Sequence, residues 1–123
     1  MSDGQLLERF VAGHDESAEA GFAALVDRHG SMVLRVCRQI LGDAHDAEDA
    51  FQATFLVLAR RAGLVRKRES VASWLYGIAH RVARRCRADS ARRLEHERRR
   101  AAMNTMESSD DTVRNPSDRK SVV

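Results

Sequence analysis

The chain has 123 residues, of which 43% are hydrophobic and 32% are charged. That length and composition suit one domain with a modest core and exclude a large enzyme with a deeply buried pocket. Proline occurs once and glycine seven times, so a turn-rich all-β fold is not expected. The sequence has no apolar run that could span a membrane and no secretory signal, so we expect a cytoplasmic protein.

Charge is segregated along the chain. Residues 1–59 hold 4 Lys and Arg against 10 Asp and Glu, a net of −6, whereas residues 60–100 hold 14 against 4, a net of +10. Residues 101–123 hold 3 against 4, a net of −1. A basic block of this density indicates nucleic-acid binding, and the acidic block suits a basic protein surface. The alternative is two solvated helix faces that differ in sign.

Apolar residues recur at helical spacing in four stretches. The first covers residues 5–12 and ends at Gly13, and the second covers about residues 17–41 and ends at Gly42. Gly30 interrupts the second helix at a cost of about 1 kcal/mol relative to alanine, which its many apolar positions can absorb.

The third helix is expected to begin after an N-cap at Asp43 and to end near Gly63. A basic loop over residues 64–69 follows, and Ser70 is expected to cap the fourth helix. The apolar stripe of that helix fades after Cys86, and no segment has the alternation of a strand.

These elements predict an all-α fold, a compact bundle of about four helices over residues 1–100. A disordered tail or truncated linker is expected over residues 101–123, because this segment is polar and aperiodic. Cys37 and Cys86 lie in helical patterns far apart in the sequence, and they are predicted to be reduced thiols.

Catalysis is the first functional class to test. The five histidines show no metal-ligand spacing, and no glycine-rich loop follows a strand. Asp46, Glu48 and Asp49 form a carboxylate cluster, but their position at a helix start is explained by the helix dipole. His29 lies on an apolar stripe and is predicted to be a half-buried core residue. We therefore expect no catalytic residue, no metal and no cofactor.

Binding is the class that the fourth helix supports. Opposite its apolar stripe it carries cationic side chains beside an aromatic one, a combination that holds phosphates and stacks unpaired bases. Tyr76 is the expected base contact, whereas Trp74 is expected to lie mostly in the core. The predicted nucleic-acid-binding residues are Arg66, Lys67 and Arg68 of the loop and Ser73, Tyr76, His80, Arg81, Arg84 and Arg85 of the helix.

Two runs resemble a known family. Residues 46–60, DAEDAFQATFLVLAR, resemble region 2.2 of the sigma-70 family. Residues 71–83, VASWLYGIAHRVA, resemble regions 2.3 and 2.4 of its extracytoplasmic-function (ECF) branch. The resemblance covers about residues 5–100. It implies a sigma factor that binds RNA polymerase core and directs promoter minus-ten recognition and DNA melting in transcription initiation.

The resemblance also implies which residues meet which partner. Region 2.2 of the family docks on the clamp helices of the largest polymerase subunit, and here that face would be Glu48, Asp49, Gln52 and Leu56. Regions 2.3 and 2.4 engage the minus-ten element and capture a flipped base, so the loop and helix residues above would contact promoter DNA. An anti-sigma factor is a further partner that the resemblance allows, and no membrane partner is expected.

Two other readings stay open. The runner-up is a small helical nucleic-acid-binding regulator that acts without polymerase. The third is a helical adaptor whose basic helix meets only acidic protein. Binding to core polymerase separates the first reading from the second, and salt-dependent DNA binding separates both from the third.

The sequence departs from the family pattern at three places. Ala53 stands where the family usually has Glu, and Val71 replaces the usual aromatic residue. His80 and Arg81 replace the common Arg-Asn pair. An arginine at position 81 can grip phosphate or guanine, but it cannot replace asparagine in reading adenine.

The largest departure concerns the family's second helical domain, region 4, which reads the minus-thirty-five element. Nothing after Met103 resembles it, and residues 118–123 resemble the translation of a sequencing adapter. We therefore expect a truncated gene product, with weak or no initiation from promoters that need both elements.

Overall fold

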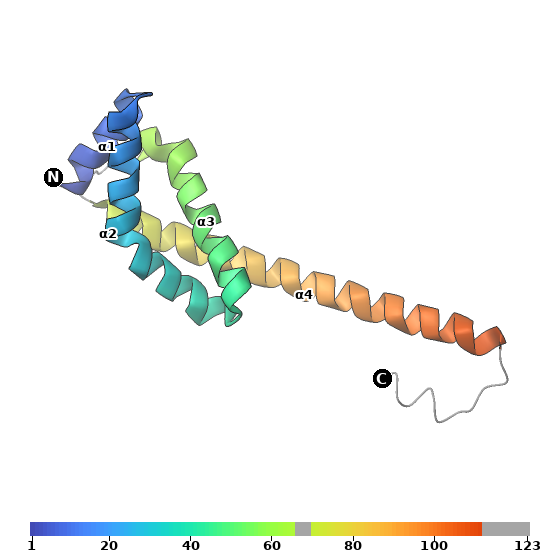
Figure 1. Ribbon diagram of the computed structural model, residues 1–123. Coiled ribbons are helices and arrows are strands. Elements are labelled where there is room, and N and C mark those ends of the chain that lie inside the picture. Colours follow the sequence, from blue (N-terminus) through green and yellow to red (C-terminus); the bar gives the residue numbers. More distant parts are fainter. Residues whose placement is uncertain (66–69, 112–123) are drawn as a thin grey trace. The chain divides into compact units, whose positions relative to one another are not determined.

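The computed structural model describes residues 1–65 and 70–111, and their side chains as far as residue 105. Within these residues the chain forms four α-helices, which are α1 (Asp3–Ala12), α2 (Glu16–Leu41), α3 (Ala44–Arg61) and α4 (Val71–Asp111) (Figure 1). A short 3-10 helix, η1 (Ala62–Leu64), follows α3. The described residues contain no strand, so the all-α prediction is confirmed. None of these helices is apolar over a length that could cross a bilayer.

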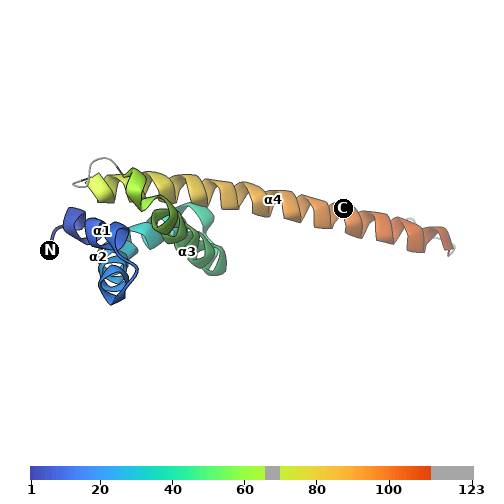
Figure 2. The ribbon, with the colours of Figure 1, turned by 90° about the horizontal axis from the view of Figure 1, so that it is seen from above.

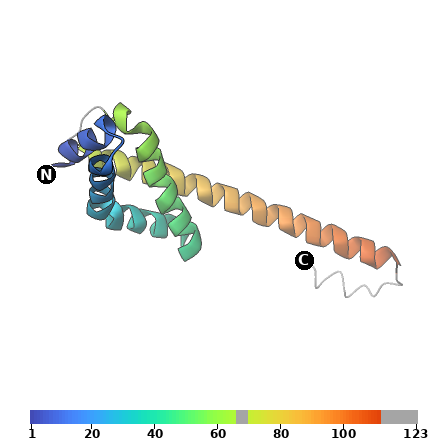
Figure 3. The same ribbon diagram turned by 45° about the horizontal axis from the view of Figure 1, so that its top comes forward.

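The chain divides into two compact units, Met1–Arg87 and Ala88–Val123. The first unit contains α1, α2, α3, η1 and the first part of α4. Figures 2 and 3 show α1, α2 and α3 grouped beside that first part of α4. The expected domain boundary at residue 100 stays a prediction.

Local capping signals set the helix ends. The Asp43 carboxylate accepts hydrogen bonds from the backbone N–H groups of His45 (2.7 Å) and Asp46 (3.3 Å), which confirms the predicted cap of α3. The C-terminal end of α2 is capped by Gly42, whose φ of +76° is a conformation that suits glycine. Its N–H donates to the Arg38 carbonyl at 3.0 Å. α1 begins earlier than predicted because Ser2 forms a capping box with Gln5.

All four helices contribute to the core of the first unit. Four leucines, one from each helix, have at most 1% of their surface exposed: Leu7, Leu25, Leu58 and Leu75. Each buried leucine contributes about 1.5–3 kcal/mol relative to an exposed one. Thr54 is also buried, and its hydroxyl donates to the Ala50 carbonyl at 2.7 Å, so this polar group is satisfied. The apolar stripes predicted from the sequence therefore face one common core.

Cys37 lies in this core as a free thiol. Its burial, together with the thiol of Cys86, raises the pKa of Cys37 above the ordinary value. Cys37 consequently stays protonated at neutral pH and packs as a small apolar side chain. The predicted reduced state of Cys37 agrees with the structure.

α4 extends further than the sequence pattern predicted. It continues to Asp111, so residues 101–111 are helical where a disordered tail was expected. Beyond Cys86 the residues are mostly Ala, Arg and Glu, which favour a helix without any buried stripe. Ion pairs within the helix, Asp89–Arg92 and Glu95–Arg99, add to this preference. Residues 112–123 lie outside the described part of the chain.

A polar cluster ties the start of α1 to α2. His29 is 8% exposed, and its Nε2 lies 2.9 Å from Oδ2 of Asp3. Arg28 donates from Nη1 to Oδ1 of Asp3 at 2.8 Å and from Nη2 to the Met1 carbonyl at 2.7 Å. His29 is thus a core histidine, as predicted, but it is more deeply buried than expected and is paired with a carboxylate.

This cluster makes the stability depend on pH. Burial alone would raise the pKa of Asp3, but hydrogen bonds and positive charge from Arg28 and His29 outweigh burial and hold that pKa below its ordinary value of 3.8. The unfolded chain therefore binds a proton at Asp3 more readily than the folded chain does. The stabilisation is complete above the ordinary pKa and is lost as the pH falls through the lower, folded-state pKa.

We expect Asp3→Asn to lower the free energy of unfolding by about 1 kcal/mol at neutral pH, because it removes a charge-assisted pair whose Arg28 partner is partly exposed. The difference from the unmutated chain should shrink as the pH falls below 3.8. Thermal unfolding followed by circular dichroism at several pH values measures both effects. Asp27→Asn, which alters an exposed carboxylate on α2, is the control. A difference that persists undiminished into acid would contradict this account.

Candidate functional site

One exposed face of α3 carries all four residues predicted to meet the polymerase. The helix buries Ala47, Ala50, Thr54, Phe55 and Leu58. The predicted set, Glu48, Asp49, Gln52 and Leu56, is exposed, and its spacing places it along one side of the helix. We call these four residues the α3 face.

The α3 face combines acid and apolar character. Leu56 is 57% exposed, so this face also offers apolar surface. Among the described residues, neither Glu48 nor Asp49 has an ion-pair partner. The small side chains of Ala47 and Ala50 have 0% exposure and lie against the core, so their acidic neighbours are left in solvent. This surface can pair with positive charge and bury one leucine on binding.

The first part of α4 carries the predicted nucleic-acid contacts. Its buried side contains Val71, Leu75, Ile78, Ala79 and Ala83. The other side of the helix carries six of the predicted residues: Ser73, Tyr76, His80 and Arg84 in one row, and Arg81 and Arg85 next to that row. All of these are exposed except His80, which is half-buried. We call these six residues the α4 face.

The three loop residues of the prediction, Arg66, Lys67 and Arg68, lie outside the described residues. Trp74 is partly buried and packs against the core cluster, as predicted. Tyr76 is 50% exposed, so part of this side chain is accessible to a binding partner. The structure therefore brings together the helical part of the predicted site.

Tyr76 and His80 form a ring pair on the α4 face. Their centroids are 4.6 Å apart and their planes meet at 62°, an edge-to-face geometry. Nδ1 of His80 is buried and has no hydrogen-bond partner among the described residues. Sequence reasoning selected both residues but did not anticipate their contact. The i, i+4 spacing is the signal that could have indicated it.

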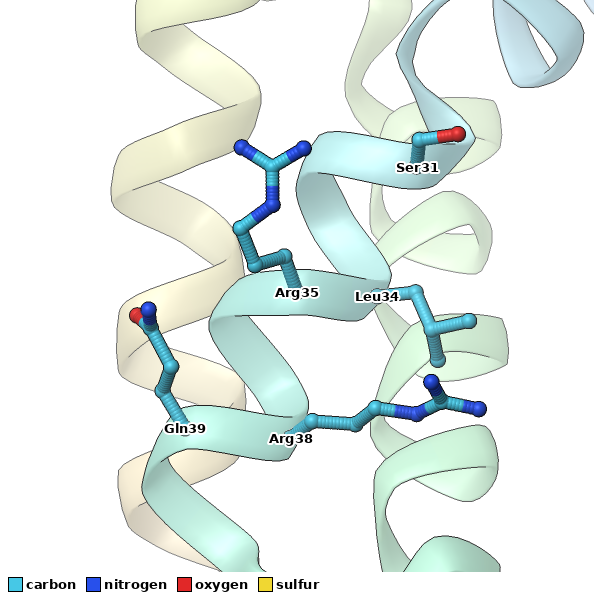
Figure 4. A pocket seen from close by; sticks show the side chains of 5 residues that line it. All are labelled: Ser31, Leu34, Arg35, Arg38 and Gln39. Carbon is cyan, nitrogen blue, oxygen red and sulfur yellow. The ribbon is translucent and has the colours of Figure 1, made fainter.

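Sequence reasoning overlooked a hollow on the outer side of α2. It is lined by Ser31, Leu34, Arg35, Arg38 and Gln39 (Figure 4). The side chains of Arg35 and Gln39 extend to one side of α2, whereas Leu34 and Arg38 extend to the other (Figure 4). The two guanidinium groups therefore do not converge on a common anion, and the hollow is not a site built for one.

No group of three His, Cys, Asp or Glu that could hold a metal ion occurs within residues 1–65 and 70–111. One helix of the unit thus presents an acidic face, and the next presents a basic face with an exposed aromatic ring.

Comparison with protein families identifies this architecture. The family Sigma-70 region 2 matches residues 25–93, more than half of the chain. The match includes all of α3 and the part of α4 that carries the α4 face. The chain belongs to the sigma-70 region 2 family, and its role is that of a sigma factor in transcription initiation. No curated protein and no solved structure matched the chain.

Proposed function

We propose that this chain is a sigma factor of the ECF branch that binds RNA polymerase core through the α3 face and the promoter minus-ten element through the α4 face. The observation that carries the proposal is the presence of both faces within one unit, Met1–Arg87. The proposal places the protein in the cytoplasm, where core polymerase and promoter DNA meet.

The chemistry of the α3 face suits a basic helical partner, such as the clamp helices of the largest polymerase subunit. The carboxylates of Glu48 and Asp49, which form no ion pair with another described residue, favour encounter with positive charge and set the orientation of docking. Leu56 offers apolar surface that a partner can bury, at about 25 cal/mol per Å². Gln52 lies along the helix between Asp49 and Leu56, and its amide can both donate and accept hydrogen bonds.

The chemistry of the α4 face suits DNA whose bases are unpaired. Stacking one base on an aromatic ring is worth about 1–3 kcal/mol, and unstacking a base from the duplex costs a few kcal/mol. Arginine contacts to the phosphates can supply the remainder. Tyr76 provides the ring, and Arg81, Arg84 and Arg85 provide the cations. Such a surface favours the melted minus-ten element over the closed duplex.

Removing two arginines tests the phosphate contacts. We expect Arg81→Ala with Arg84→Ala to make the salt dependence of single-stranded DNA binding shallower by about 1.4 units, at about 0.7 per phosphate contact. The slope of log affinity against log salt concentration, measured by fluorescence anisotropy, gives this number.

The matched control removes two charges elsewhere in the same unit. Arg35→Ala with Arg38→Ala on α2 lowers the net charge equally but lies outside the α4 face. The control should keep the slope of the unmutated chain. An unchanged slope in the Arg81 and Arg84 variant would show that these arginines do not touch the DNA backbone, and equal changes in both variants would show a general charge effect.

A further inference from the structure

We infer that the α4 face reads an unpaired guanine in preference to adenine, because His80 presents a hydrogen-bond donor at Nε2. This inference rests on the proposed binding of melted DNA by α4 and adds a base preference to it. The observations behind it are the buried, unpartnered Nδ1 of His80, the ring contact with Tyr76 and the arginine that follows one turn later.

The buried Nδ1 decides where the imidazole carries its proton. A neutral imidazole has one N–H donor and one acceptor nitrogen. A proton on Nδ1 would place a donor where no described residue can accept it, and buried N–H groups without acceptors are rare in folded proteins. A proton on Nε2 leaves the donor on the other side of the ring. His80 is only half-buried, and its Nε2 makes no hydrogen bond with a described residue. The neutral ring is therefore the Nε2–H tautomer.

The contact with Tyr76 holds this donor in place. The edge-to-face pair, with centroids 4.6 Å apart, limits rotation of the His80 ring on the helix surface. Because Tyr76 is also the exposed ring on which a base can stack, the stacked base lies within reach of the His80 ring edge. Arg84 lies one helical turn beyond His80 and adds further donors on the same side.

Two donors side by side select a base edge with two acceptors. Guanine presents N7 and O6, both acceptors, whereas adenine presents the N7 acceptor and the N6 amino donor. A donor at His80 Nε2 therefore pairs with guanine O6 and opposes the adenine amino group. In the Nδ1–H tautomer, Nε2 would instead accept a hydrogen bond from the adenine amino group, and adenine would be the favoured base. The position of one proton thus decides which purine is preferred.

The test compares oligo-dT strands that carry a single central guanine, adenine or 7-deazaguanine, which lacks the N7 acceptor. We expect the full 123-residue chain to bind the guanine strand about tenfold more tightly than the adenine strand in fluorescence anisotropy. The 7-deazaguanine strand should bind with intermediate affinity, because one of its two acceptors is missing. Equal affinities for all three strands would overturn the inference and leave the proposed DNA binding intact.

Variants of the histidine give the second arm. His80→Gln should bring the ratio of guanine to adenine affinity close to one, because an amide side chain can both donate and accept. His14→Gln, at an exposed histidine outside the α4 face, should keep the ratio of the unmutated chain. A guanine preference that survives His80→Gln would show that another residue reads the base.

A third measurement does not depend on DNA. Nitrogen-15 NMR of the unmutated chain distinguishes the two tautomers, and a protonated Nε2 with an unprotonated Nδ1 is expected for neutral His80. Protonation at Nδ1 would overturn the inference whatever the strands bind. Absence of salt-dependent binding to every strand would instead refute the proposed DNA role of α4, and the base preference with it.

Discussion

Replacing Asp49 with arginine is expected to weaken binding to core RNA polymerase by about tenfold or more and to abolish co-purification with it. The substitution reverses a charge in the acidic part of the α3 face, where no described residue forms an ion pair with Asp49. Close charge pairs across protein interfaces have coupling energies of about 1.5–7 kcal/mol, and a reversal turns attraction into repulsion. Because Asp49 is exposed, the variant should unfold at nearly the same temperature as the unmutated chain.

The control for this experiment is Asp27→Arg, which makes the same change of charge at an exposed position on α2. That variant should still co-purify with core polymerase. Single-stranded DNA binding should persist in both variants, because neither touches the α4 face. Retention of polymerase binding by Asp49→Arg would refute docking through α3. Failure of the unmutated chain to bind core polymerase would instead favour a regulator that binds nucleic acid alone.

Gln52→Ala provides a milder change on the same face. It removes a hydrogen-bonding side chain without altering charge, so it tests contact rather than electrostatic steering. A smaller loss of affinity than in Asp49→Arg, without a changed salt dependence, is the expected pattern. The two variants together separate the contribution of charge from that of direct contact.

The sequence predicted the helix faces well because they depend on local signals. The caps at Asp43 and Gly42 and the apolar spacing of α3 each involve residues a few positions apart. Burial of Ala47 and Ala50 then fixes the direction of Asp49 without any knowledge of the partner helices. The residues of the α3 face and of the helical part of the α4 face could therefore be predicted from the sequence alone.

Other features depend on contacts that no local pattern contains. Asp3 meets Arg28 and His29 across 25 and 26 positions of sequence, and only the packing of α1 on α2 brings them together. The length of α4 was underestimated for a different reason. This part of α4 has no apolar periodicity, and Ala, Arg and Glu favour a helix there by propensity alone.

Two glycines of α2 should respond in opposite ways to the same substitution. Gly21→Ala is expected to lower the free energy of unfolding by about 1–2 kcal/mol, although alanine favours a helix by about 1 kcal/mol. A Cβ at position 21 would lie 2.9 Å from the Leu6 carbonyl oxygen and 3.3 Å from Cβ of Arg9. The first contact is with backbone of α1, so relief requires α1 to move away from α2.

Gly30→Ala on the same helix is the matched comparison. There a Cβ would meet only the Phe51 ring, at 3.5 and 3.6 Å, which is ordinary van der Waals contact. The propensity gain of about 1 kcal/mol then stands, and the variant should be more stable than the unmutated chain. Thermal unfolding should show melting temperatures that differ between the two variants by roughly 8–24 °C, at about 4–8 °C per kcal/mol for a unit of this size. Equal stabilisation by both substitutions would show that α1 does not approach α2 closely at Gly21, and the position of Asp3 beside His29 would then lose its structural basis.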